Sequence, residues 1–279
     1  MGSDLIKKKI LIVGAKGFIG SNLLSQLSIE NVELYGTSRK GSDDFFRLDL
    51  EKDSRNKYDR DINHNWNYVI YCVNILTGNI DHFYRLKAFL QDFSGVFILL
   101  SSVDVNGMVG KLLPNHMINP SPITDYGIQK LKEEFFVRKN FSSYKILRLF
   151  PVYSPNEKTD ILKRVYISKF FKLKLRLLPS LSYRFVEIKT LIAAVKEIVV
   201  SDDCTNSINY IYDPSPYDQN ILCEKNEGRS IPVPVFLIKI LIWVLSKLPS
   251  ARIKLLSLNL SKLVNPVRLS DSDCYSTIV

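Results

Sequence analysis

The sequence predicts an α/β protein built on a doubly wound parallel sheet, and two observations support that prediction. Short apolar runs rich in β-branched residues occur at residues 9–13, 67–73 and 96–100, as expected of strands that are buried on both faces. Stretches with helical apolar periodicity lie at residues 21–27 and 125–139. Strands that alternate with helices in this way are typical of a parallel sheet covered by helices on both sides.

A glycine-rich turn follows the first apolar run, with Gly14, Gly17 and Gly20 before an amphipathic helix start. Side chains here would keep a diphosphate away from the amides of the helix N-terminus, where partial positive charge favours an anion. Gly14 and Gly17 would permit that approach, and Gly20 would let the helix pack closely on the strand. The triplet also suits an ordinary strand-to-helix turn, but its place after a buried strand favours a dinucleotide cradle that includes Phe18 and Ile19.

The end of the second predicted strand, residues 32–37, should meet the adenosine ribose of that dinucleotide. An acidic residue there would favour NAD, because it would accept hydrogen bonds from the ribose hydroxyls. The chain instead has Ser38, Arg39 and Lys40, which favour NADP(H) since they can pair with a 2′-phosphate. A solvated basic loop is the alternative. Asp49 follows in a position that suits a hydrogen bond from the adenine amino group.

Three further residues predict acid–base chemistry. Ser102 follows the apolar run at residues 96–100, and active sites of parallel sheets lie beyond the carboxyl ends of the strands. Tyr126 and Lys130 are four residues apart in a predicted helix, so they share one helix face. A phenol has a pKa of about 10 in water and needs a neighbouring ammonium to act at neutral pH. We therefore predict that Ser102 binds the reacting oxygen, Tyr126 transfers its proton, and Lys130 supports the phenol and the nicotinamide ribose.

Taken in chain order, these motifs resemble those of the extended short-chain dehydrogenase/reductase family. Within that family the resemblance is to the NAD(P)-dependent nucleotide-sugar epimerases, dehydratases and reductases. It covers nearly the whole chain, through residues 145–155, 184–188 and 231–234. It implies a Rossmann-type doubly wound parallel sheet with a small, interleaved C-terminal cap that binds substrate. The cofactor domain would comprise residues 1–150 and 185–213, and the cap would comprise residues 151–184 and 214–279.

The chain departs from the family pattern mainly on the substrate side. Asn106 replaces the tyrosine of the family's SSxxVYG motif. Pro151, which has no amide donor, replaces an asparagine that usually contacts the nucleotide diphosphate. Lys189 and Thr190 replace paired aspartates. The resemblance implies that Arg184, just before the returning strand, binds the substrate phosphates and that Asn106 is a second substrate contact.

Composition and charge narrow the classes of fold and partner that the chain can have. With 279 residues, of which 46% are hydrophobic, the chain can bury a full sheet and its helices. Part of its net charge of +10 lies in residues 158–176, where basic groups suit either a diphosphate or a solvated amphipathic helix. No nucleic-acid motif accompanies the charge.

The apolar run at residues 231–248 is too short for a transmembrane helix and is interrupted by lysines. It favours a buried cap helix over a helix that contacts a membrane surface.

The four cysteines and three histidines are scattered without the spacing of metal ligands, so we assign no metal. We expect a reduced, cytoplasmic protein without a signal peptide.

The combined motifs predict a nicotinamide-dependent oxidoreductase. We expect a reductase that uses NADPH to convert the 4-keto group of a nucleotide-activated deoxysugar to an alcohol, in surface polysaccharide biosynthesis. The alternative is a 4-epimerase of a nucleotide sugar or polyprenyl-diphosphate sugar, which retains NAD and returns the hydride to the opposite face. The intact Ser102, Tyr126 and Lys130 argue against a non-catalytic NADP-binding regulator. A homodimer is compatible with either enzyme.

Overall fold

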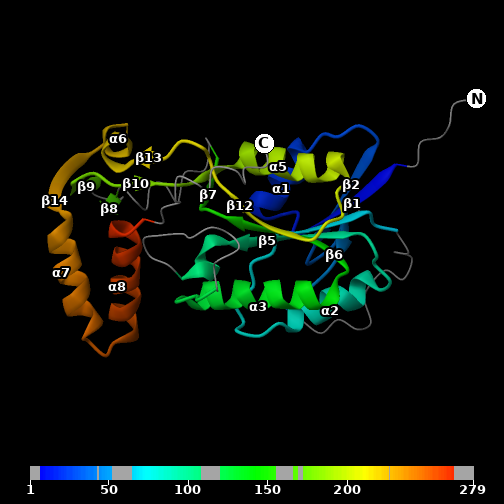
Figure 1. Ribbon diagram of the computed structural model, residues 1–279, viewed down its shortest axis with the longest axis horizontal. Coiled ribbons are helices and arrows are strands. Elements are labelled where there is room, and N and C mark those ends of the chain that lie inside the picture. The colour runs from blue at the N-terminus through cyan, green and yellow to red at the C-terminus, as the bar shows by residue number, and fades with distance from the viewer. Residues whose placement is uncertain are drawn as a thin grey trace, which may run out of the picture.

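The computed structural model describes residues 7–42, 44–51, 65–107, 120–154, 166–168, 172–225 and 227–266. A larger part holds a central sheet between two layers of helices, and a smaller part projects from one end of it (Figure 1).

A seven-stranded sheet forms the centre of the larger part, in the order β3-β2-β1-β4-β5-β6-β12. Every neighbouring pair in it is parallel. Its strands are β1 (Lys8–Val13), β2 (Val32–Ser38), β3 (Phe45–Arg47), β4 (Tyr68–Tyr71), β5 (Val96–Ser102), β6 (Ser143–Leu149) and β12 (Ser207–Ile211). The direction of winding reverses between β1 and β4, and ligands bind beyond the strand ends at such a point. The predicted doubly wound parallel sheet is confirmed.

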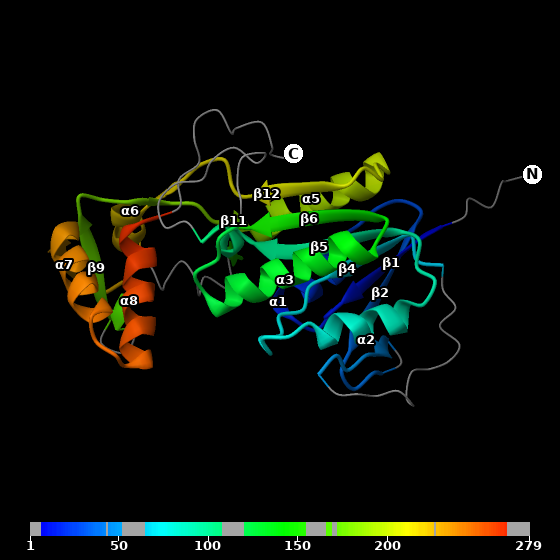
Figure 2. The same cartoon turned by 60° about the horizontal axis from the view of Figure 1, so that its bottom comes forward.

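Helices cover both faces of this sheet. α1 (Phe18–Gln26) and α5 (Ile188–Ser201) pack on one face, and α2 (Asp81–Leu90) and α3 (Asp125–Asn140) pack on the other (Figures 1 and 2).

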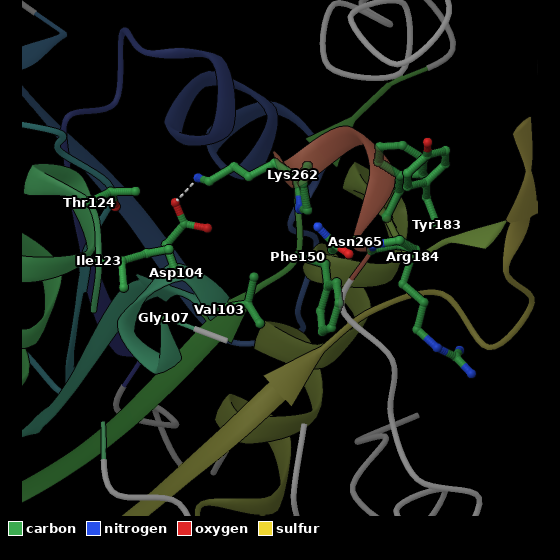
Figure 3. A pocket seen from close by; sticks show the side chains of 13 residues that line it. Val103, Asp104, Gly107, Ile123, Thr124, Phe150, Tyr183, Arg184, Lys262 and Asn265 are labelled. Atoms are coloured by element: carbon green, nitrogen blue, oxygen red, sulfur yellow. Dashed lines mark hydrogen bonds and ion pairs between the residues drawn. The ribbon is translucent and has the colours of Figure 1, made fainter. Parts of the chain in front are cut away.

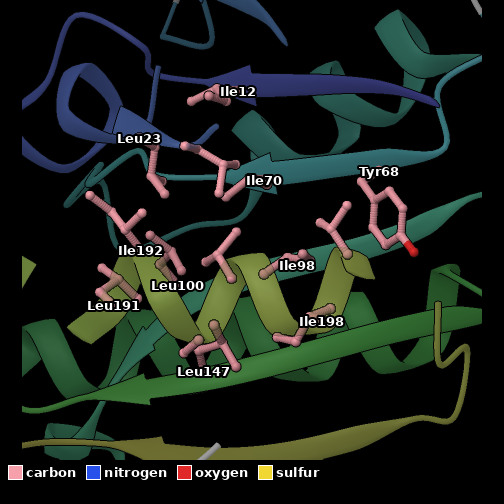
Figure 4. Packing of buried hydrophobic residues seen from close by; sticks show 14 of the residues in the cluster. Ile12, Leu23, Tyr68, Ile70, Ile98, Leu100, Leu147, Leu191, Ile192 and Ile198 are labelled. Carbon is pink, nitrogen blue, oxygen red and sulfur yellow. The ribbon is translucent and has the colours of Figure 1, made fainter. Parts of the chain in front are cut away.

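The alternation of side chains along the strands divides the core into two clusters. Ile12, Ile70 and Ile98 lie on adjacent strands and pack with Leu23 of α1 and Leu191 of α5 (Figure 4). The side chains one position earlier on each strand belong to the cluster on the opposite face. Full burial of one aliphatic side chain stabilises the fold by about 1.5–3 kcal/mol. Runs of such residues therefore specify strands in the middle of the sheet.

The described residues of the smaller part form a three-stranded sheet in the order β14-β9-β8 and three helices. These elements are β8 (Tyr166–Ser168), β9 (Leu173–Leu178), β14 (Arg229–Pro234), α6 (Gln219–Glu224), α7 (Val235–Ser246) and α8 (Ala251–Val264). Two short strand pairs lie between the two parts: β7 (Val152–Tyr153) with β11 (Val186–Glu187), and β10 (Ser182–Tyr183) with β13 (Tyr217–Asp218). The chain leaves the large sheet after β6, returns to it through α5 and β12, and then enters the smaller part again.

One sequence expectation about the smaller part is wrong, and one alternative does not hold for the residues that are described. Residues 158–176 suited either a diphosphate site or a solvated amphipathic helix; the described portion forms β8 and β9, and Lys174 there is buried and donates to the carbonyl of Cys223 at 2.6 Å. Lys158, Lys163, Arg164 and Lys169 lie outside the described residues. The apolar run at 231–248 was expected to be a buried helix, yet most of α7 is exposed to solvent.

Candidate active site

The glycine-rich turn has the geometry that a diphosphate cradle requires. Gly14 has a φ of +87°, and a Cβ atom there would lie 2.8 Å from Cγ2 of Val73. A Cβ atom at Gly20 would lie 2.9 Å from Cα of Ala15, so only glycine lets α1 pack this closely on the turn. Gly17 is the N-cap of α1 and has no side chain to cover the helix N-terminus. The turn thus leaves room for a phosphate where the helix attracts one.

A cleft of about 1000 Å³ lies between the two parts of the chain. Phe18 and Ile19 of the cradle line it, and so does Leu260 of α8. Ser102, Tyr126 and Lys130, which were predicted from sequence alone, also line this cleft, as do Val73, Pro151, Leu175, Leu256 and Lys262. The structure therefore brings the proposed acid–base residues and the cradle to one cavity.

The start of α3 fixes the position of Tyr126. Thr124 is the N-cap, and its side chain accepts a hydrogen bond from the amide of Gly127 at 2.9 Å, an interaction worth about 1 kcal/mol. Burial raises the pKa of Tyr126, while the positive charge of Lys130 and a hydrogen bond with Ser102 lower it. Ser102 also accepts a hydrogen bond from the amide of Asp104 at 3.2 Å and so caps η1 (Val103–Asn106).

Lys130 is buried and held by two partners. Its ammonium donates to Oε2 of Glu133 at 2.9 Å and to the carbonyl of Val73 at 3.3 Å. The other oxygen of Glu133 lies 3.4 Å from Nε2 of His82, which is also fully buried. Among the described residues, that oxygen and both ring nitrogens of His82 have no hydrogen-bond partner.

The sequence reasoning missed Glu133 and His82. A signal existed for Glu133, because an acidic residue three positions after Lys130 shares its helix face. No pattern pointed to His82, which α2 brings to the site from an earlier part of the chain.

A second buried polar cluster supports the end of β5. Ser101 donates to Glu134 at 2.5 Å, and Glu134 forms a bidentate ion pair with Arg148 at 2.8 and 3.0 Å. Arg148 also donates to Oδ1 of Asn106 at 3.1 Å, and the Asn106 amide donates to the Tyr210 hydroxyl at 2.6 Å. Asn106, expected to touch substrate, thus has both ends of its side chain bonded inside this cluster. The cluster holds the strand that carries Ser102.

The expected ribose site at the end of β2 contains both predicted residues. Ser38 is buried and accepts a hydrogen bond from the amide of Gly41 at 3.1 Å. Arg39 is exposed and forms an ion pair with Glu51 at 3.2 Å, a carboxylate that the sequence reasoning did not consider. Asp49 accepts a hydrogen bond from the Glu51 amide at 3.0 Å. A 2′-phosphate would therefore compete with Glu51 for Arg39.

On the substrate side, Arg184 does not line the cleft itself but lines a smaller pocket that shares Asp104 and Lys262 with it. Its guanidinium donates to the carbonyls of Pro214 at 2.9 Å and Asp213 at 3.3 Å, and it points away from Asp104 in Figure 3. Figure 3 also shows Lys262 of α8 reaching Asp104, with an ion-pair distance of 2.5 Å. This contact joins the smaller part to the turn after β5. No sequence pattern indicated it.

No cluster of three or more histidine, cysteine, aspartate or glutamate side chains suited to a metal ion occurs in the part of the chain that the structure describes.

Comparisons with known proteins bear on the family and the fold. A family model described as "NAD dependent epimerase/dehydratase family" matches residues 10–174. No curated protein matches the chain by sequence. Among solved structures, a UDP-glucuronic acid 4-epimerase from Bacillus cereus in complex with NAD has a TM-score of 0.64 at 20% identity, over 81% of this chain and 87% of that one. A dTDP-4-dehydrorhamnose reductase from Bacillus anthracis in complex with NADP has a TM-score of 0.64 at 16% identity, over 83% and 86%.

A third solved structure, an ADP-L-glycero-D-manno-heptose-6-epimerase from Helicobacter pylori, has a TM-score of 0.63 at 19% identity, over 84% of this chain and 87% of that one. At these identities the structures show a shared fold, whereas the family model covers more than half of the sequence. The chain is an enzyme of the NAD dependent epimerase/dehydratase family.

Proposed function

We propose that the chain is an NADPH-dependent reductase of a nucleotide-activated 4-keto-deoxysugar. The observation that carries the proposal is the shared cleft, in which Ser102, Tyr126 and Lys130 lie with the cradle residues Phe18 and Ile19. Cofactor binding and proton transfer can therefore take place in one cavity.

The residues of this cleft suit the reduction of a carbonyl group. Tyr126 would donate its phenolic proton to the carbonyl oxygen, and Ser102 would donate a hydrogen bond to the same oxygen. When bound, a nicotinamide supplies the hydride. Burial raises the pKa of Tyr126, so the phenol keeps its proton at neutral pH until a more basic oxygen develops. The ammonium of Lys130 then stabilises the phenolate that remains.

The preference for NADPH rests on the end of β2, where Thr37 and Ser38 stand in place of a carboxylate and Arg39 follows. The ion pair between Arg39 and Glu51 is exposed, and such pairs contribute only about 0–1 kcal/mol. A 2′-phosphate, with its larger charge, would displace Glu51 at little cost.

A second candidate function is a 4-epimerase that retains NAD. The observation in its favour is Glu51 itself, because a carboxylate beside the ribose site repels a 2′-phosphate. Among the structures of similar fold, the UDP-glucuronic acid 4-epimerase contains NAD, whereas the dTDP-4-dehydrorhamnose reductase contains NADP.

Two incubations separate the candidates. Purified protein is mixed with NADPH and dTDP-4-dehydrorhamnose, and the loss of NADPH absorbance is followed; a parallel sample receives UDP-glucuronic acid with NAD. The reductase predicts one NADPH oxidised for each sugar reduced. Interconversion of UDP-glucuronic acid with its 4-epimer, without net change in cofactor, would overturn the proposal in favour of the epimerase.

Arg184 stays our candidate for the substrate diphosphate, because its backbone partners are neutral carbonyls that a phosphate could replace. We expect Arg184→Ala to raise the KM for the nucleotide sugar and to leave NADPH affinity unchanged. An unchanged KM would remove Arg184 from the substrate site.

A further inference from the structure

The outer helix of the smaller part carries a large exposed apolar surface. Of the residues of α7, all of which are described, only Val235 and Ile238 are buried. Trp243 is 64% exposed and Phe236 is 61% exposed. The remaining exposed apolar side chains of this surface are Leu237, Ile240, Leu241, Val244 and Leu248. Soluble proteins rarely expose contiguous apolar patches of this kind unless they bind something there.

The surface faces away from the active-site cleft. α7 lies at the outer edge of the smaller part, and α8 runs beside it on the side of the large sheet (Figures 1 and 2). α8 contributes Leu260 and Lys262 to the cleft, whereas no α7 residue lines it. A ligand in the cleft therefore cannot cover α7.

The segment that forms this surface carries charge of one sign. Residues 229–264 contain no aspartate or glutamate and six basic residues: Arg229, Lys239, Lys247, Arg252, Lys254 and Lys262. Lys239 of α7, Lys247 directly after α7 and Lys254 of α8 are exposed. The Lys247 ammonium lies 5.8 Å from the centre of the Trp243 ring, so the basic and aromatic groups share one surface.

This combination determines the partner that fits. A second copy of the chain, packed through the same surface, would bring two uniformly basic segments together and cause repulsion. An anionic lipid surface instead offers a hydrocarbon boundary for the apolar side chains and negative headgroups for the lysines. No helix among the described residues has the length and hydropathy to cross a membrane, so the contact would be made in the plane of the surface.

We propose that the hairpin of α7 and α8, residues 235–264, docks this enzyme on an anionic membrane surface. Phe236 and Trp243 insert at the boundary between headgroups and acyl chains, and Lys239, Lys247 and Lys254 contact the headgroups. The proposal does not depend on the identity of the substrate.

Vesicle binding by the full chain tests the proposal. The protein is sedimented with vesicles of phosphatidylcholine alone, or of equal parts phosphatidylcholine and phosphatidylglycerol. We expect binding to the anionic vesicles, weak binding to the neutral ones, and release at 1 M salt, where the Debye length falls to about 3 Å. No binding to anionic vesicles at physiological salt would overturn the proposal.

The two tryptophans of the chain make the contact visible by fluorescence, because Trp66 is buried in the core and Trp243 is exposed. Anionic vesicles should shift the emission of the wild type to shorter wavelength, and Trp243→Ser should abolish that shift. Trp66→Phe, which keeps an aromatic ring in the core, should retain it. A shift that survives in Trp243→Ser would contradict the assigned surface.

Matched variants distinguish binding through this surface from nonspecific adsorption to vesicles. Trp243→Ser should lose most vesicle binding, whereas Phe135→Ser, at a position 56% exposed on α3, should bind like the wild type. Lys247→Ala should weaken binding about fivefold, as expected for one basic residue at an anionic surface, and Lys196→Ala on α5 should not. Equal effects at test and control positions would overturn the proposal. A second result would also overturn it: a wild type that does not bind vesicles but forms a dimer, and a Trp243→Ser variant in which that dimer dissociates. A second copy of the chain would then be the partner.

Discussion

The ion pair between Lys130 and Glu133 yields the sharpest prediction about the active site. Glu133→Gln removes the negative charge that lies 2.9 Å from the buried ammonium while keeping the size of the side chain. Loss of one partner from a buried ion pair destabilises a protein by about 3–5 kcal/mol, because the other charge stays buried without compensation. The carbonyl of Val73 still accepts from Lys130, so we place the expected loss near the lower end of that range.

The same change should alter the pH dependence of the reaction. The negative charge of Glu133 raises the pKa of Tyr126, and the positive charge of Lys130 lowers it. Without Glu133, the pKa of Tyr126 should fall. In the reducing direction Tyr126 must be protonated, so activity declines as pH rises through this pKa, and in Glu133→Gln the decline should begin at lower pH.

Urea unfolding and the pH profile of kcat/KM measure the two effects. Glu197→Gln, at an exposed position of α5, is the matched control and should change the free energy of unfolding by less than about 0.5 kcal/mol. The role assigned to the Lys130–Glu133 pair would be refuted if Glu133→Gln were as stable as this control and its kcat/KM declined at the same alkaline pH as that of the wild type.

Two further predictions concern the cofactor. Arg39→Asp should weaken NADPH binding relative to NADH, because a charge-assisted contact of roughly 1.5–3 kcal/mol is lost. Glu51→Gln should strengthen NADPH binding, because it frees Arg39 from its ion pair. Titrations in which neither variant changes the ratio of NADPH to NADH affinity would defeat the NADP preference. Gly20→Ala should lower stability by about 1–3 kcal/mol and weaken both cofactors, because its Cβ would meet Cα of Ala15 at 2.9 Å; calorimetry and cofactor titration that match the wild type would show that the cradle is not tightly packed.

Local patterns predicted the parts of this molecule that local chemistry determines. Continuous β-branched runs predicted the buried strands, since few other structures bury both faces of a short segment. Gly20 was expected to permit close helix packing, and its geometry leaves no room for a side chain. The spacing of Tyr126 and Lys130 placed both on one face of α3, and both line the cleft.

Contacts between distant segments escaped the sequence reasoning. His82 meets Glu133, and Lys262 meets Asp104, across many residues of chain and between different elements. Hydrophobicity also gave a wrong expectation for α7. An apolar run indicates that a helix packs against an apolar surface, but it does not indicate whether that surface belongs to the same chain. The interior of this protein covers only one edge of that helix.

The central claim is that Tyr126 transfers a proton during a nicotinamide-dependent reaction, and the most direct test is the turnover of Tyr126→Phe with the sugar nucleotide that the wild type reduces. NADPH oxidation is followed by absorbance, and NADPH affinity is measured separately. The account predicts that kcat falls by about a hundredfold to ten-thousandfold while cofactor affinity stays close to that of the wild type. A variant that keeps most of its turnover would contradict the account, because the proton would then come from another group.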